Sequence, residues 1–282
     1  MNNYLTESIL RVFERLEYYK GYIFHLENDI KKYTQSLIDN LDKNKTNFLK
    51  GSRLIISDFT GESDNGWEIN FPLPTSGYIV TSDNYLEKNN QLIQVISSTL
   101  VAQSYEALET FFKEILISYF KNNNQIAFET IGKANCIWNM NNVDWYNTVR
   151  KLKQGINNRK LLKIFRILSP EFRKAEITNL KNIDLEKWFD IISIVRHAII
   201  HSESILKNDE FNKIDENGRK ILEKFFEVEN QDGGNKKIII TGKHASNVIE
   251  FMCEYAFQVF KWLSISVNLD WRILPNMNKN EA

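Results

Sequence analysis

The chain has 282 residues, of which 43% are hydrophobic and 26% charged, and its 36 basic and 36 acidic side chains give a formal net charge of zero. This length and composition indicate a globular protein with a sizeable core, and the balanced charge excludes a surface coated in positive charge for long nucleic-acid tracks. No stretch approaches about 18 uninterrupted apolar residues, which excludes a membrane-spanning helix, and Cys136 and Cys253 are too few and too far apart for a disulfide framework or a metal knuckle.

Residues 1–90 predict an N-terminal extension that is first helical and then β-rich. Residues 4 to about 48 predict a long helix or a helical hairpin, because apolar residues recur at helical spacing. Short β-like runs follow at residues 53–59, 67–73 and 78–81, divided by Gly-containing turn signals. The helical stripe consists of Leu5, Ile9, Phe13, Leu16, Tyr19, Ile23, Leu26 and Ile30.

Residues 91–272 predict a mainly α-helical domain. Within it, the Asn-rich stretch 121–146 predicts loops. Phe225–Val228 and Lys236–Thr241 flank an Asn- and Gly-rich turn, which predicts a β-hairpin inserted into the bundle. Residues 273–282 predict a flexible tail. A strong helical stripe opens the domain between Ser104 and Phe120 and consists of Tyr105, Leu108, Phe111, Phe112, Ile115, Leu116 and Tyr119.

The most informative segment is Ile194–His201, with the sequence IVRHAIIH, near the end of a predicted helix. At about 100° per residue, Arg196, His197, Ile200 and His201 fall on the face opposite the apolar one. A solvated helix would carry a charged residue at the position of Ile200, so this face predicts an interface between two copies of the helix. The apolar face, which predicts the core side, consists of Trp188, Ile191, Ile192, Ile194, Val195, Ala198 and Ile199.

The side chains of Arg196, His197 and His201 suit the cleavage of RNA. An imidazole titrates near neutral pH and can take a proton from a ribose 2′-hydroxyl or return one to the leaving 5′-oxygen. A guanidinium can bind the scissile phosphate and stabilise the extra negative charge of the transition state, and this reaction needs no metal. The alternative is that Arg196 and His197 belong to a solvated helix face, and that His201 caps the helix C-terminus, where the macrodipole favours a cation.

The spacing of Arg196 and His201 resembles the Arg-x4–6-His motif of HEPN domains, whose active members are metal-independent ribonucleases. The resemblance covers about residues 95–268 and implies a HEPN-like helical bundle. HEPN toxins that a partner nucleotidyltransferase silences usually carry Tyr two residues after the motif His, where this chain has Glu203, so that regulation is not expected. The resemblance assigns the first long helix to Ser104–Phe120, the motif helix to Leu185–Ser204 and the closing helix to Ser246–Ser266.

The resemblance implies an endoribonuclease that leaves 2′,3′-cyclic phosphate and 5′-hydroxyl ends and acts as a homodimer through the motif helix. In it, His201 would transfer the proton, Arg196 would bind the phosphate, and His197 would orient or assist. The implied biological role is that of a cytoplasmic toxin or antiphage defence effector that acts on RNA. An antitoxin or other regulatory partner is expected, and no cofactor is. The alternative function is a catalytically inactive HEPN module that binds RNA or a partner protein. The third hypothesis is a purely structural helical protein that neither binds nor cuts RNA.

His197 and His201 also have the i, i+4 spacing of a helical zinc pair. Because the adjacent Arg196 would repel a cation and no third ligand is apparent, no metal site is predicted. Glu106 and Glu109, on the polar side of the first domain helix, either orient the motif Arg or His across the bundle or form a solvated acidic face.

The segment Arg150–Lys187 has eleven basic residues against four acidic ones, a net charge of +7. It predicts either a patch that contacts a phosphate backbone or the solvated faces of middle helices. Trp138 and Trp145 are candidate base-stacking platforms, or else buried loop anchors. We expect the lone histidines His25 and His244 to be surface or helix-capping residues.

Overall fold

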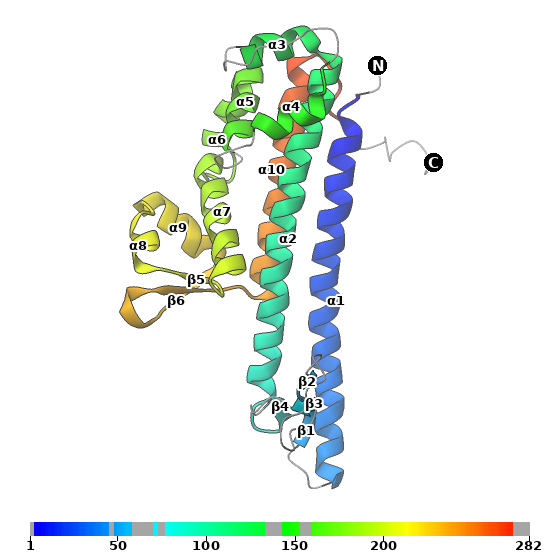
Figure 1. Ribbon diagram of the computed structural model, residues 1–282, viewed down its shortest axis with the longest axis vertical. Coiled ribbons are helices and arrows are strands. Elements are labelled where there is room, and N and C mark those ends of the chain that lie inside the picture. The colour runs from blue at the N-terminus through cyan, green and yellow to red at the C-terminus, as the bar shows by residue number, and fades with distance from the viewer. Residues whose placement is uncertain are drawn as a thin grey trace. The chain divides into compact units, whose positions relative to one another are not determined.

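The computed structural model describes residues 3–44, 48–57, 70–72, 77–132, 143–152 and 159–272. Helices dominate these residues, which confirms the predicted mainly α fold (Figure 1). The chain divides into two compact units, one formed by Phe24–Val95 and the other by Met1–Ile23 together with Ile96–Ala282. Among the described residues, no helix has the length and apolar character needed to cross a membrane.

The larger unit is a helical bundle with an aromatic centre. Phe112, Phe189 and Tyr255, from three different helices, have ring centroids that all lie within 6.0 Å of one another. Every residue of the predicted stripe between Ser104 and Phe120 is buried, because the stripe follows the helical period along one face. The helices are α1 (Thr6–Asn44), α2 (Tyr85–Asn122), α3 (Asn124–Gly132), α4 (Trp145–Leu152), α5 (Arg159–Leu168), α6 (Pro170–Ile177), α7 (Leu185–His201), α8 (Asn208–Asn212), α9 (Glu216–Phe225) and α10 (Gly242–Ser266).

The first part of α1 belongs to the larger unit, which differs from the predicted boundary at residue 90. Leu5, Ile9, Val12 and Leu16 are buried in the same core cluster as the α2 stripe, so burial of apolar surface makes this start of the chain part of the bundle. The helix runs unbroken from Thr6 to Asn44, which selects the long helix over the helical hairpin.

The smaller unit, residues 24–95, contains two antiparallel strand pairs. β1 (Phe48–Ser52) pairs with β4 (Tyr78–Thr81), and β2 (Ile55–Ser57) pairs with β3 (Asn70–Pro72). β4 has the predicted bounds, and β2 and β3 fall within the two other predicted runs. β1 is an addition to the predicted strands, because the apolar spacing predicts helix to about residue 48, whereas α1 ends at Asn44. Residues 53 and 54 of those runs are described but lie outside β2, and residues 58–59, 67–69 and 73 lie outside the described residues.

A three-stranded antiparallel sheet follows the end of α7. Its order is β5 (Ile205–Leu206), β7 (Lys236–Ile239) and β6 (Glu227–Asn230), which confirms the predicted hairpin and adds one strand. The hairpin turns through Gly233 and Gly234, which have φ angles of 70° and 79°, a region that favours glycine. β5 begins four residues after His201 and pairs with β7, so the hairpin is hydrogen-bonded to the segment that follows α7.

The stretch 121–146 was predicted as loops, and this is wrong for Asn124–Gly132, which forms α3. The asparagines gave a turn signal, but Ala127 and Thr130 are buried against the bundle, and this packing outweighs the local preference. Trp145 opens α4 and is buried, with its ring centroid 5.3 Å from that of Phe120, so it is a buried anchor, of a helix and not of a loop, and not a stacking platform. Trp138 and the predicted tail lie outside the described residues.

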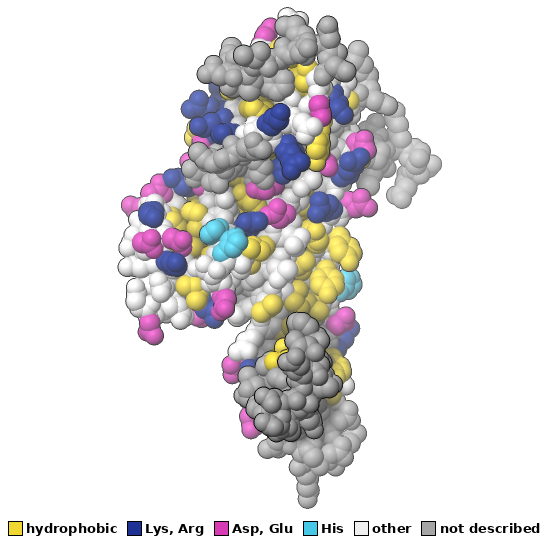
Figure 2. Space-filling model, in the orientation of Figure 1, with side chains coloured by type: hydrophobic (Ala, Val, Ile, Leu, Met, Phe, Trp, Pro, Cys, Tyr) yellow, Lys and Arg dark blue, Asp and Glu magenta, His cyan; other side chains and the backbone are white. Residues whose placement is uncertain are grey.

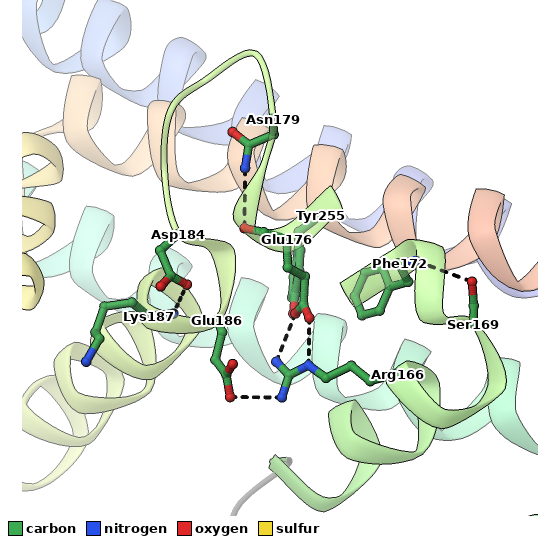
Figure 3. A network of polar contacts seen from close by, with 9 residues as sticks. All are labelled: Arg166, Ser169, Phe172, Glu176, Asn179, Asp184, Glu186, Lys187 and Tyr255. Atoms are coloured by element: carbon green, nitrogen blue, oxygen red, sulfur yellow. Dashed lines mark hydrogen bonds and ion pairs between the residues drawn. The ribbon is translucent and has the colours of Figure 1, made fainter. Parts of the chain in front are cut away.

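A buried polar network fixes the N-terminal end of α7 against its neighbours (Figure 3). Arg166 of α5 donates two hydrogen bonds to the Glu176 carboxylate of α6, from Nε at 2.6 Å and from Nη2 at 3.0 Å, and a third from Nη1 to Glu186 of α7 at 2.9 Å. The Tyr255 hydroxyl of α10 donates to Glu176 at 2.8 Å. Burial, the largest single influence, lowers the pKa of Arg166, but the hydrogen bonds to Glu176 together with the negative charges of Glu176 and Glu186 outweigh it, so the pKa is raised. For the Tyr255 hydroxyl, burial disfavours the charged form and therefore raises the pKa.

Candidate functional site

Helix α7 begins and ends with defined caps. Asp184 is the N-cap, and its side chain accepts a hydrogen bond from the Lys187 backbone N–H at 2.9 Å. The helix ends at His201, three residues before the predicted end, because the two residues that follow Ser202, Glu203 and Ser204, adopt left-handed φ angles of 50° and 65°. The chain therefore leaves the helix axis at once, and His201 stands in its last turn.

The two predicted faces of α7 are confirmed by burial. The core face is buried at Trp188, Ile191, Ile192, Val195 and Ala198, and partly buried at Ile194 and Ile199. On the opposite face, His197 and His201 are exposed and Arg196 is partly buried. The Ile200 side chain is 50% exposed, as expected for an apolar residue placed on the polar face. In Figure 2, histidine side chains are visible on the surface of the molecule, next to hydrophobic, basic and acidic side chains.

The guanidinium of Arg196 is held by a carboxylate from another helix. Its Nη2 donates to Glu106 of α2, which lies 90 residues earlier in the chain. The two side chains keep 30% and 43% of their surface exposed, so solvent screens this ion pair. Within the described residues, the buried Nε of Arg196 has no hydrogen-bond partner. Glu106 therefore orients the guanidinium and leaves part of its donor capacity unused.

The two histidines of the motif are neighbours on successive turns. The imidazole centroids of His197 and His201 lie 4.6 Å apart, with an angle of 47° between the ring planes. Both residues are on the exposed side of the helix. The described residues contain no group of three or more His, Cys, Asp or Glu side chains that could hold a metal ion. The arrangement thus offers two accessible imidazoles and one oriented guanidinium.

The motif side chains lie outside a crevice that other described residues form. That crevice has a volume of about 420 Å³ and lies between the α6–α7 loop and α10, with Leu180, Lys181, Phe251 and Phe257 among its lining. Small-molecule sites are usually enclosed pockets. A group of exposed side chains at a helix end is instead accessible to a large or extended substrate.

The predicted basic segment is partly used for internal ion pairs. Arg166, Lys181 and Lys187 are paired with Glu176, Glu254 and Asp215 respectively. Exposed basic side chains remain on α4, α5 and α6, and these are Arg150, Lys151, Lys163, Arg173 and Lys174. The ion pairs are a use that the sequence analysis did not predict, and the exposed side chains fit either predicted use, contact with a phosphate backbone or a solvated helix face.

Of the other predicted histidines, His244 is the capping residue. It stands at the third position of α10, where its Nδ1 lies 3.3 Å from the Thr241 backbone nitrogen, and Thr241 is the N-cap. His25 is exposed on α1. Cys253 is partly buried against the core, and burial raises its pKa to about 11, so the thiol stays protonated and unreactive near neutral pH.

Compared with protein-family models, with curated proteins and with solved structures, the chain has no match.

Proposed function

We propose that the chain is a metal-independent endoribonuclease that leaves 2′,3′-cyclic phosphate and 5′-hydroxyl ends. One observation supports this above the others: Glu106 of α2 orients Arg196 at the same exposed helix end as the His197–His201 pair. The alternative of a plain solvated helix face does not account for an arginine that is held across the bundle with a buried Nε.

The chemistry divides between the two kinds of side chain. His201 takes the proton from the 2′-hydroxyl or returns one to the leaving 5′-oxygen, and His197 supports it from the preceding turn. Arg196 donates to the phosphate oxygens and stabilises the charge that develops there. Glu106 is a positioning residue in this scheme, because it contacts the guanidinium and not the RNA.

A homodimer through α7 is part of the proposal. On one helix, Arg196 and His201 diverge by about 140°, so a single copy gives a loose pair. Ile200, half exposed between them, is the apolar residue that a second copy of α7 would cover. Two copies would provide two arginines and four histidines at a shared cleft.

RNA binding without cleavage is the second candidate function, and the exposed basic side chains of α4, α5 and α6 favour it because they can contact a phosphate backbone without the two histidines. The resemblance to HEPN domains supports a cytoplasmic toxin or defence effector with an antitoxin or other regulatory partner.

The test is cleavage of total cellular RNA by the purified chain in EDTA, with His201→Ala as the variant and His25→Ala as the matched control. General acid–base catalysis contributes about 10²–10⁴-fold, and we expect His201→Ala to lose a factor of that size while His25→Ala cuts like the wild type. Cyclic-phosphate ends would identify the reaction. Salt-dependent RNA binding by a wild type that never cuts would favour the binding module, and equal cutting by His201→Ala would contradict the assignment.

A further inference from the structure

We propose that His197 and His201 form a two-imidazole site for a divalent transition metal such as Zn²⁺, and that the bound ion inhibits the ribonuclease. The metal site stands on geometry alone, whereas its inhibitory effect rests on the proposed function.

The geometry is that of a helical chelate. Histidines at i and i+4 face the same side of a helix and supply two of the ligands in helical zinc motifs. The ring centroids of His197 and His201 are already 4.6 Å apart, and both side chains are exposed. Small side-chain rotations can therefore bring one nitrogen of each ring to the Zn–N distance of about 2.0–2.1 Å.

The local charge favours a cation more than the sequence suggests. Arg196 was expected to repel a metal, but its charge is compensated by the ion pair with Glu106 of α2. His201 is the last residue of α7, where the negative end of the helix dipole attracts a cation. Glu203 is exposed two residues further on and adds negative charge near this helix end.

The ligand type selects the metal. Imidazole nitrogens suit Zn²⁺, Ni²⁺ and Cu²⁺, whereas Mg²⁺ and Ca²⁺ require oxygen ligands. The described residues provide no cluster of three ligands, so water fills the other coordination positions. A site with two protein ligands exchanges its metal readily, which suits regulation and not a permanent structural role.

Occupancy would block the chemistry proposed for the same side chains. A coordinated imidazole uses, for the metal, the nitrogen lone pair that would accept a proton. With Zn²⁺ bound, His201 can no longer act as the base toward the 2′-hydroxyl. The ion is therefore an inhibitor of a reaction that itself needs no metal.

The metal site is tested by titrating ZnCl₂ into the tag-free full chain, without RNA, in a calorimeter. We expect saturable binding that weakens at least about tenfold in His197→Ala and in His201→Ala, the loss typical of a damaged metal site. The control His25→Ala should bind like the wild type, and MgCl₂ should give no binding to any of them. Absence of Zn²⁺ binding to the wild type would overturn the site. Binding as tight as that of the wild type by either motif variant would overturn it as well.

The inhibitory effect has a separate readout. RNA cleavage by the wild type should stop at the Zn²⁺ concentration that saturates the calorimetric site and should resume on addition of EDTA. Continued cleavage at saturation would overturn inhibition. If the wild type never cuts in EDTA, the proposed function fails and inhibition fails with it, while calorimetry still decides the metal site.

Discussion

Two arginines of the larger unit form ion pairs with opposite characters. Arg166 and Glu176 keep only 11% and 1% of their side-chain surface exposed, and the carboxylate receives two hydrogen bonds from the guanidinium and one from Tyr255. Arg196 and Glu106 keep 30% and 43%, and the Arg196 Nε has no partner among the described residues.

The difference separates the ends of α7 by role. Near its N-terminus, the network around Arg166 joins α5, α6, α7 and α10, and the guanidinium donates three hydrogen bonds to Glu176 and Glu186 (Figure 3). Near its C-terminus, Arg196 is oriented but not saturated, and two exposed imidazoles stand beside it. Burial thus marks the structural pair, and unused donor capacity marks the pair on which the proposed function rests.

The largest effect on stability is expected from Glu176→Gln. The substitution leaves the buried Arg166 guanidinium short of a charged partner, which costs about 3–5 kcal/mol in the free energy of unfolding. Urea denaturation measures this loss. The matched control is Lys220→Gln, which breaks the exposed i, i+4 pair with Glu216 and should cost no more than about 0.5 kcal/mol. Similar losses in both variants would contradict the structural role of the Arg166 network.

A smaller effect is expected from Glu106→Gln, which removes the charge that orients Arg196. Because both side chains are partly exposed, the free energy of unfolding should fall by less than about 1 kcal/mol. RNA cleavage should nevertheless slow, since the guanidinium loses its orientation. A loss of stability as large as that of Glu176→Gln would show that both arginines serve the fold.

The smallest effect concerns Asp215, which pairs with Lys187 of α7 and caps α9. The hydrogen bond from Lys187, and next that from the Gly218 backbone, lower the pKa of Asp215 below its ordinary value of 3.8. A lowered pKa stabilises the fold above that ordinary value, and the stabilisation disappears as the pH falls through the lowered pKa. Asp215→Asn should therefore melt below the wild type at pH 6, and the gap in Tm should close in strong acid. A gap that is independent of pH would contradict the ion pair.

Much of the fold could be predicted because burial follows the helical period. The stripes of α2 and α7 appear in the sequence as repeated apolar residues, and the hairpin appears as two β-like runs around a Gly-Gly turn. α3 was missed because its asparagines favour a turn until Ala127 meets the core. Here tertiary packing decided against the local preference.

The part of the candidate site that lies within helix α7 could be predicted from the sequence, whereas the partners of its contacts with other helices could not. The faces of Arg196, His197 and His201 follow from angles along α7. The sequence offered Glu106 and Glu109 as residues that orient the motif Arg or His, but it could not select the pair of Glu106 with Arg196, because that contact joins residues 90 positions apart. The Arg166–Glu176 network was not foreseen at all, since both residues lie in a basic segment that resembles a solvated surface.

The most direct test compares Arg196→Lys with Arg166→Lys, measuring RNA cleavage per folded molecule and the unfolding midpoint of each. Lysine keeps the charge but loses the forked geometry of the guanidinium. We predict that Arg196→Lys unfolds like the wild type and cuts at least about tenfold more slowly, equivalent to roughly 1.4 kcal/mol of lost transition-state stabilisation. Arg166→Lys should unfold earlier and cut normally while folded. Wild-type cleavage by Arg196→Lys, or lost cleavage by a folded Arg166→Lys, would contradict the division between the two arginines.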